Sequence, residues 1–230
     1  TAFTEGSNVV STPVVVDGAL TVIDADNATL ASGTVSITAG LQTAQDVLAF
    51  TNIPATMGNI LGAHNAGTGI LTLTSAGATA TVAQWQTALR SVTYTNSSDT
   101  PNTTTRTISF VANDGTANSN TATKNVSITA VNDTPVLAAI EGTALAYTEN
   151  DPATAITSTT TATDADNTNL AGATIQITGN YQNGQDVLAF TNTVNITGTW
   201  TAATGTMALT GSDTVANYQA AIRAVTYQNT

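Results

Sequence analysis

The sequence predicts an all-β chain of two tandem β-sandwich domains, and three observations carry that prediction. The chain repeats itself: Asp-Ala-Asp-Asn at residues 24–27 returns at 164–167, and the octapeptide at 45–52 returns at 185–192, each 140 positions later. Threonine makes up about a fifth of the residues and alternates with aliphatic residues, which is typical of half-buried strands. Clusters of glycine, asparagine and aspartate separate these segments, as turns do. The period matches a whole domain, so each copy should have its own core.

The first copy is expected to contain about seven strands, as an immunoglobulin-like Greek-key sandwich does. In chain order these strands are expected at residues 14–23, 33–39, 46–51, 69–74, 92–95, 105–112 and 121–130. One short helix should interrupt them, because Val82, Trp85 and Leu89 have the spacing of one helix face and Thr81 precedes them as a cap. Residues 215–222 repeat this pattern, so each domain should have one short helix, with Trp85 and Tyr218 in the cores.

The domains are expected at residues 1–134 and 135–230, with 131–136 as a short linker stiffened by Pro135. A third match, between residues 90–96 and 223–229, is shifted by 133 positions, so the second copy is shorter by seven residues before it. The second copy should lack its last two strands, and the chain is interpreted as a window of a longer array. Those strands either lie further along the array or come from a neighbouring molecule in a fibre.

Composition restricts the partners. Four basic and 15 acidic residues give a net charge of −11, which argues against nucleic acid and anionic membranes and makes cations the natural counterpart. No apolar run approaches the 18 or so residues of a membrane span, and cysteine is absent. An enzyme is not expected, because His64 is the only histidine and is placed in a glycine-rich loop. Arg90 and Asp46, like their repeats Arg223 and Asp186, should be either ion-paired or simply solvent-exposed.

The acidic residues gather at the repeated landmarks. Asp24 and Asp26 flank a single residue, so in an extended chain both carboxylates point to the same side, and Asp164 and Asp166 repeat the arrangement. Two close carboxylates repel each other unless a cation lies between them, and a loop rich in Asp and Asn oxygens suits calcium. The alternative is that these aspartates are solvated residues of Asx turns.

These landmarks resemble those of the cadherin repeat and its bacterial cadherin-like relatives in large calcium-dependent surface adhesins. The resemblance rests on Thr-Glu-Asn at 148–150, Asp-Ala-Asp at 164–166, Ala-Asn-Asp-Gly at 112–115 and Asn-Asp-Thr-Pro at 132–135. Asp99 lies fifteen residues before Asp114, where the family has the aspartate of Asp-Arg-Glu. Three family ligands are replaced, by Pro101, Ala130 and Thr134, so one or two ions per junction are expected in place of three.

The resemblance implies calcium ligands at both ends of each domain. The junction inside this chain would use Glu5, Asp99, Asn132, Asp133, Asp164 and Asp166. A preceding domain would be met by Asp24, Asp26 and Asp114, and a following one by Glu149. Ions shared in this way would turn a flexible linker into a rigid joint, because releasing them would leave like charges crowded together.

The expected function is therefore that of a non-enzymatic extender repeat in a large extracellular adhesin or fibre on a bacterial cell surface, rigidified by calcium between domains. Its expected partners are neighbouring repeats of the same chain or identical chains in a fibre. Two alternatives remain open: a domain that binds a carbohydrate or another cell-surface ligand, and a filament subunit completed by strands from its neighbour.

Overall fold

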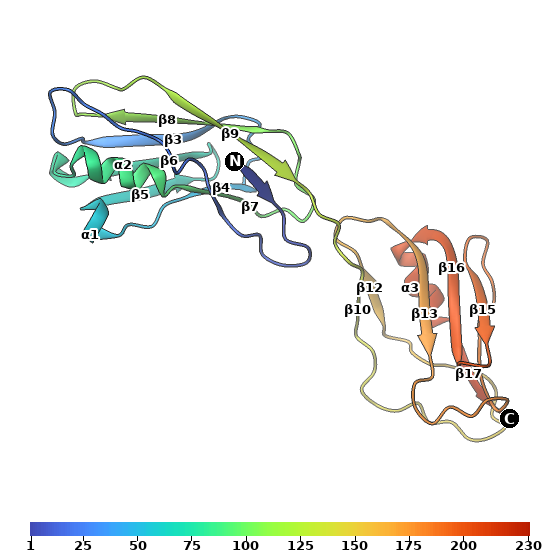
Figure 1. Cartoon of the computed structure of the whole chain (residues 1–230). Coiled ribbons are helices and arrows are strands. Elements are labelled where there is room, and N and C mark those ends of the chain that lie inside the picture. The colour runs from blue at the N-terminus through green and yellow to red at the C-terminus, as the bar shows by residue number, and fades with distance from the viewer. The chain divides into compact units, whose positions relative to one another are not determined.

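The computed structural model describes residues 1–230, and the chain forms two compact units, Thr1–Asn132 and Asp133–Thr230 (Figure 1). Both units are mostly β and contain several sheets. None of the helices combines the length and the apolar character that a membrane span requires.

The first unit contains two sheets. The larger has six strands in the order β1-β9-β8-β3-β6-β5, and only β1 runs parallel to its neighbour. Its strands are β1 (Ala2–Thr4), β3 (Ser32–Ala39), β5 (Ile60–Asn65), β6 (Ile70–Ser75), β8 (Arg106–Asn113) and β9 (Ala122–Thr129). The smaller sheet, in the order β2-β7-β4, consists of β2 (Val14–Val15), β4 (Asp46–Ala49) and β7 (Thr93–Asn96).

Helix α2 (Val82–Arg90) packs into the core that both sheets share, which makes the unit β-sandwich-like. The expected helix is confirmed: Thr81 accepts a hydrogen bond from the backbone of Gln84, and the Gln84 side chain accepts one from the backbone of Thr81. Trp85 is fully buried and its indole N–H donates to the Leu30 carbonyl at 2.9 Å. The other helical segments are α1 (Pro54–Met57) and a 3₁₀ turn (Ala76–Ala78).

The second unit has three small sheets and one helix. The first sheet pairs β10 (Val136–Ala138) with β12 (Thr161–Thr163). The second has the order β11-β17-β14 and consists of β11 (Thr154–Ala155), β14 (Asp186–Ala189) and β17 (Thr226–Asn229). The third has the order β13-β16-β15 and consists of β13 (Asn169–Gln176), β15 (Thr197–Thr201) and β16 (Thr206–Thr214). Helix α3 (Val215–Arg223) is capped by Thr214, whose side chain accepts a hydrogen bond from the backbone of Asn217, and the helix buries Tyr218 in this unit's core.

The two units share a common framework. Val35 of β3 lies opposite Leu71 of β6, and the equivalent Ile175 of β13 lies opposite Met207 of β16. The two units differ in what lies on the other side of β3 and of β13. In the first unit β3 pairs with β8 as well as with β6, whereas β13 has a strand on one side only and is the edge of its sheet.

Several expected elements differ in the structure. The strand expected at residues 14–23 ends after Val15, because the following segment is bonded to side chains of α2: Gln86 accepts from the backbone of Val22 and Arg90 donates to the carbonyl of Leu20. Strands β1 and β5 were not expected. His64 lies in β5 and not in a loop, and it is half-buried.

Candidate metal centre

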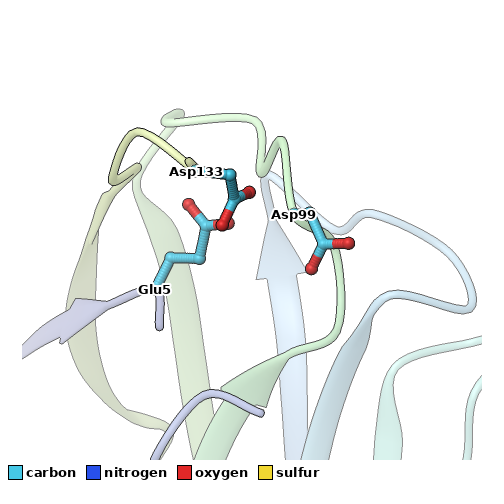
Figure 2. A group of neighbouring side chains, drawn as sticks. All are labelled: Glu5, Asp99 and Asp133. Atoms are coloured by element: carbon cyan, nitrogen blue, oxygen red, sulfur yellow. The ribbon is translucent and has the colours of Figure 1, made fainter. Parts of the chain in front are cut away.

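Three carboxylates of the expected ligand set come together in the structure. Glu5, Asp99 and Asp133 each offer an oxygen, and these oxygens all lie within 4.8 Å of one another (Figure 2). Glu5 and Asp133 are buried, with 5% and 0% of their surface exposed, while Asp99 is exposed. The triad therefore has two buried members and one member open to solvent.

Each of the three residues lies shortly after the end of a strand, and that strand helps to fix its position. Glu5 follows β1, and its backbone N–H donates to the Thr129 carbonyl at 3.0 Å, which extends the parallel pairing of β1 with β9. Its side chain accepts a hydrogen bond from the backbone of Val131 at 2.9 Å, just beyond β9. Asp133 follows two residues later in the chain. Glu5 and Asp133 are thus brought together by the same β1–β9 pairing.

Asp99 is positioned by the loop after β7. The Asn96 side chain accepts from the backbone N–H of Ser98 at 2.9 Å, and the Ser98 hydroxyl accepts from the backbone N–H of Thr100 at 3.1 Å. These two turns lie on either side of Asp99 and fix the course of the chain there. Figure 2 shows Asp99 beside the Glu5 and Asp133 carboxylates, on a separate segment of chain.

The geometry fits a hard divalent cation. Calcium binds oxygen ligands at about 2.3–2.6 Å, so two oxygens on one ion are separated by no more than about 5 Å. The 4.8 Å limit of the triad meets this condition. All three ligands are carboxylates, which suits calcium better than zinc, because zinc sites usually include nitrogen or sulfur ligands. Carboxylates this close repel each other, and a cation between them would remove that repulsion.

Asp133 is the first residue of the second unit. Its backbone N–H donates to the carboxylate of Asp166 at 3.2 Å. The Asp164 carboxylate accepts from the backbone N–H groups of Asp166 at 3.3 Å and Asn167 at 2.9 Å. The bond from Asn167 is the main cause of the lowered pKa of Asp164. One residue of the triad therefore contacts the Asp-Ala-Asp loop of the second unit through its backbone.

The repeated loop in the first unit forms a separate acidic group. Asp24 accepts from the backbone N–H groups of Asn27 and Asp26, and the Asn27 side chain donates to Asp114 at 3.1 Å. Asp114 in turn accepts from the backbone of Ala117 and Thr116. These backbone donors lower the pKa of both Asp24 and Asp114, while the nearby charge of Asp24 partly opposes the shift at Asp114.

The structure thus distributes the ten expected ligands over several places. Both Asp24 and Asp164 form the Asx turns that the alternative interpretation expected. Asn132 is exposed, and its carbonyl accepts from the Ser7 hydroxyl at 2.9 Å. Glu149 is exposed and lines a groove of the second unit.

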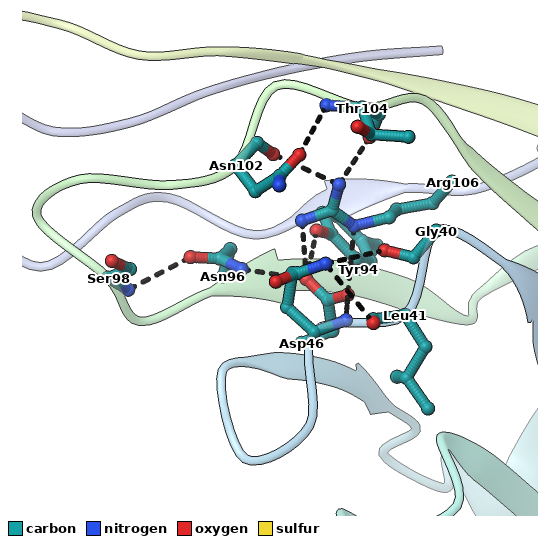
Figure 3. A network of polar contacts seen from close by, with 10 residues as sticks. Gly40, Leu41, Asp46, Tyr94, Asn96, Ser98, Asn102, Thr104 and Arg106 are labelled. Atoms are coloured by element: carbon teal, nitrogen blue, oxygen red, sulfur yellow. Dashed lines mark hydrogen bonds and ion pairs between the residues drawn. The ribbon is translucent and has the colours of Figure 1, made fainter.

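A buried ion pair in the first unit was not found from the sequence. Arg106 and Asp46 are both fully buried, and the guanidinium Nε lies 2.8 Å from the carboxylate (Figure 3). The Asp46 carboxylate also accepts from the Tyr94 hydroxyl at 2.6 Å and the Asn96 amide at 2.7 Å. Burial raises the pKa of Asp46, but the bonds from Arg106 and Tyr94 outweigh it and the net pKa is lowered.

The predicted ion pair between Arg90 and Asp46 is therefore wrong, because Asp46 pairs with Arg106. Arg90 donates to the backbone carbonyls of Leu20 and Ala19, and Arg223 does the same to Thr160 and Thr159. Duplication misled the sequence argument here, because both copies contain these arginines, whereas Arg106 comes after the last matched segment of the repeat, residues 90–96.

Comparison with known proteins gives one partial similarity. The chain is 41% identical over 86 residues to halomucin of Haloquadratum walsbyi, a stretch that is 37% of this chain and 1% of that protein. No protein-family model and no solved structure matches the chain. The match is compatible with an extracellular location.

Proposed function

We propose that the chain is a pair of cadherin-like repeats of a large extracellular surface protein, in which calcium ions stiffen the step from one repeat to the next. In this proposal each repeat is an immunoglobulin-like Greek-key sandwich whose core includes a nine-residue helix, α2 or α3. The expectation of a single helix per repeat is wrong for the first unit, which also contains α1. The protein acts as a structural extender and not as an enzyme, and its partners are the neighbouring repeats.

The observation that carries the proposal is the Glu5, Asp99 and Asp133 triad, with its oxygens within 4.8 Å. Two of the three carboxylates are buried, and the repulsion between like charges is stronger there than in water. A divalent cation between the three carboxylates would remove that repulsion and bind several oxygens at once.

Asp133 gives the proposed ion its mechanical role. Its carboxylate belongs to the triad, and its backbone N–H donates to Asp166 of the same unit. An ion held by the triad would fix the position of Asp133 and so restrict the chain where one unit follows the other. Asp166 and Asp164 would then be available as further oxygen ligands.

The expected stabilisation can be estimated. Extracellular calcium modules bind with dissociation constants of about 10⁻⁴–10⁻³ M. At a calcium concentration one hundred times the dissociation constant, binding to the folded state alone stabilises it by about 2.7 kcal/mol. A site of this strength would be filled in a calcium-rich medium and emptied by a chelator.

Calcium titration tests the proposal. Isothermal titration calorimetry of the chelated chain should show calcium binding, and Glu5→Gln or Asp99→Asn should weaken it at least about tenfold, because each removes one charged ligand. Asp17→Asn is the matched control, since Asp17 pairs with Lys124 in the same unit and lies outside the triad. Absence of binding, or equal weakening by the control, would contradict a site at the triad.

A further inference from the structure

Strand β5 forms one edge of the six-stranded sheet in the first unit. It pairs with β6 on one side and has no strand on the other. All six of its residues, from Ile60 to Asn65, pair with β6 without a register shift, so this edge carries no bulge. Gly62 and Ala63 are exposed, and Leu61 has 65% of its surface exposed. The backbone of this edge is therefore open to another strand.

The pairing with β6 determines which backbone groups of β5 point outward. In an antiparallel pair the N–H and C=O of one residue point to the same neighbouring strand, and those of the next residue point the opposite way. Ser75 of β6 donates its N–H to the carbonyl of Ala31, just before β3. Thr74 and Thr72 therefore direct their backbone groups to β5, where they lie opposite Leu61 and Ala63. The residues whose backbone groups point away from β6 are consequently Ile60, Gly62 and His64.

Strand β5 lacks the features that protect the edges of sheets. Such edges are shielded from further pairing by charged side chains, by proline, by bulges or by a very short length. β5 contains no aspartate, glutamate, lysine, arginine or proline. Ile60 is buried, and a Cβ on Gly62 would lie 2.9 Å from the Phe50 side chain, so these two residues face the core. Leu61 and Ala63 therefore face outward, and neither would repel a second strand.

The distribution of charge favours a second copy of this chain as the partner. The net charge of −11 makes two copies repel each other at a distance. No acidic residue lies between Asp46 and Asp99, however, and this part of the chain contains both β5 and β6. Burial lowers the pKa of His64 below its ordinary value of 6.5, so β5 is uncharged at neutral pH. A cationic partner would find no carboxylate to bind in these two strands, whereas an acidic one meets none that repels it.

We propose that β5 pairs with β5 of a second copy, antiparallel and about a two-fold axis at Gly62. The backbone groups that point outward then meet their equivalents: Gly62 bonds to Gly62 of the other copy, and Ile60 bonds to its His64. Leu61 lies opposite Ala63 of the other copy in a non-hydrogen-bonded pair, where side chains approach most closely. Each exposed leucine thus covers a small side chain of the partner, and the two sheets join into one.

The corresponding edge of the second unit is less suited to this contact. Strand β15 also ends its sheet, and it is likewise free of charged residues and proline. Its exposed residues are Thr197, Thr199 and Thr201, so it offers no counterpart of Leu61. Burial of apolar surface is the main driving force of association, which favours β5. The proposal does not depend on calcium, because no residue of the triad belongs to β5 or β6.

Sedimentation equilibrium of the full chain tests the proposal, with a chelator present and with chain concentrations from micromolar to millimolar. A reversible equilibrium between monomer and dimer is expected. Ala63→Lys should weaken dimerisation at least about tenfold, because it places like charges near the two-fold axis, as protected edges do. Ala63 is exposed, so this variant should keep the unfolding temperature of the first unit. Thr123→Lys is the matched control, since it adds the same charge at an exposed site of β9, which three strands separate from β5.

Disulfide cross-linking tests the register. The chain contains no cysteine, so introduced cysteines react only with each other. A mixture of Leu61→Cys and Ala63→Cys chains should form a linked heterodimer on mild oxidation, because directly opposite residues lie within the Cα separation that a disulfide spans. Each variant alone should link to itself more slowly, since its two cysteines are then diagonal neighbours.

The proposal is overturned by any of three results. The first is a chain that stays monomeric at millimolar concentration. The second is equal weakening of the dimer by Ala63→Lys and Thr123→Lys. The third is a dimer that Ala63→Lys leaves intact and Thr199→Lys disrupts, which would place the contact on β15. Calcium binding by Ala63→Lys, measured by calorimetry, should equal that of the unchanged chain, so failure here leaves the proposed calcium function standing.

Discussion

Asp46 and Asp186 occupy the same position in the two units and differ in a single partner. Tyrosine, asparagine and backbone donors surround both carboxylates at matching distances, but only Asp46 also has an arginine. The tyrosine, asparagine and backbone donors therefore come from β7 and from the segment just before β4, and in the second unit from β17 and from the segment just before β14. The arginine of the first unit comes from β8.

The largest expected effect tests the value of that arginine. Arg106→Gln leaves Asp46 charged and fully buried without a cation, and removal of one partner of a buried pair costs about 3–5 kcal/mol. We expect a loss of this size in the unfolding free energy of the first unit, measured by urea denaturation and Trp85 fluorescence in a Trp200→Phe background. Arg90→Gln is the matched control, because Arg90 donates only to backbone carbonyls. Equal losses from both variants would show that the buried pair has no special role.

Removal of the tyrosine hydroxyl should have a smaller effect. Tyr94→Phe deletes a hydrogen bond to a charged group, for which about 1.5–3 kcal/mol is typical. Tyr227→Phe deletes the same bond in the second unit, where Tyr227 is half-buried and water can replace the hydroxyl, so its cost should be lower. The unfolding of each unit is followed through its own amide resonances. A greater cost for Tyr227→Phe would contradict the view that the open groove weakens this network.

Acid should destabilise both units through these aspartates. The folded-state pKa of Asp46 and of Asp186 lies below the ordinary value of 3.8, because their hydrogen bonds outweigh the raising effect of burial. The stability they contribute is complete above that ordinary value and is lost as the pH falls through the folded pKa. Denaturation measured from pH 6 to pH 2 should show a flatter acid limb for the first unit with Asp46→Asn, and for the second with Asp186→Asn. An unchanged limb in both variants would mean that other carboxylates control acid unfolding.

Local patterns were sufficient to predict part of the fold. Helix α2 follows from the spacing of its apolar residues and from the Thr81 cap, and β3 and β8 follow from alternation within short segments. These features depend on neighbours in sequence, which periodicity can show. The same holds for the Asx turns at Asp24 and Asp164.

Features that depend on distant pairing could not be predicted in this way. Strand β1 is three residues long and pairs in parallel with β9, which lies more than a hundred residues away in the sequence. A local sequence pattern therefore could not predict it. Arg106 meets Asp46 only because β8 lies beside β3, and Arg106 lies after the segments that the repeat comparison matches, so that comparison could not reveal the pair.

The candidate metal centre shows the same division. Glu5, Asp99 and Asp133 were expected as ligands from a family resemblance, and their approach to within 4.8 Å depends on the β1–β9 pairing and on the loop after β7. Sequence alone could name these residues. It could not show that two of them are buried.

The most direct test of the calcium joint is the relative motion of the two units in solution. NMR relaxation of backbone amides gives a rotational correlation time for each unit, measured once with calcium in excess and once with a chelator. We predict that the two units tumble together with calcium and more independently without it, and that Glu5→Gln gives the chelated behaviour even in calcium. Correlation times that are the same in both conditions would contradict the proposed joint.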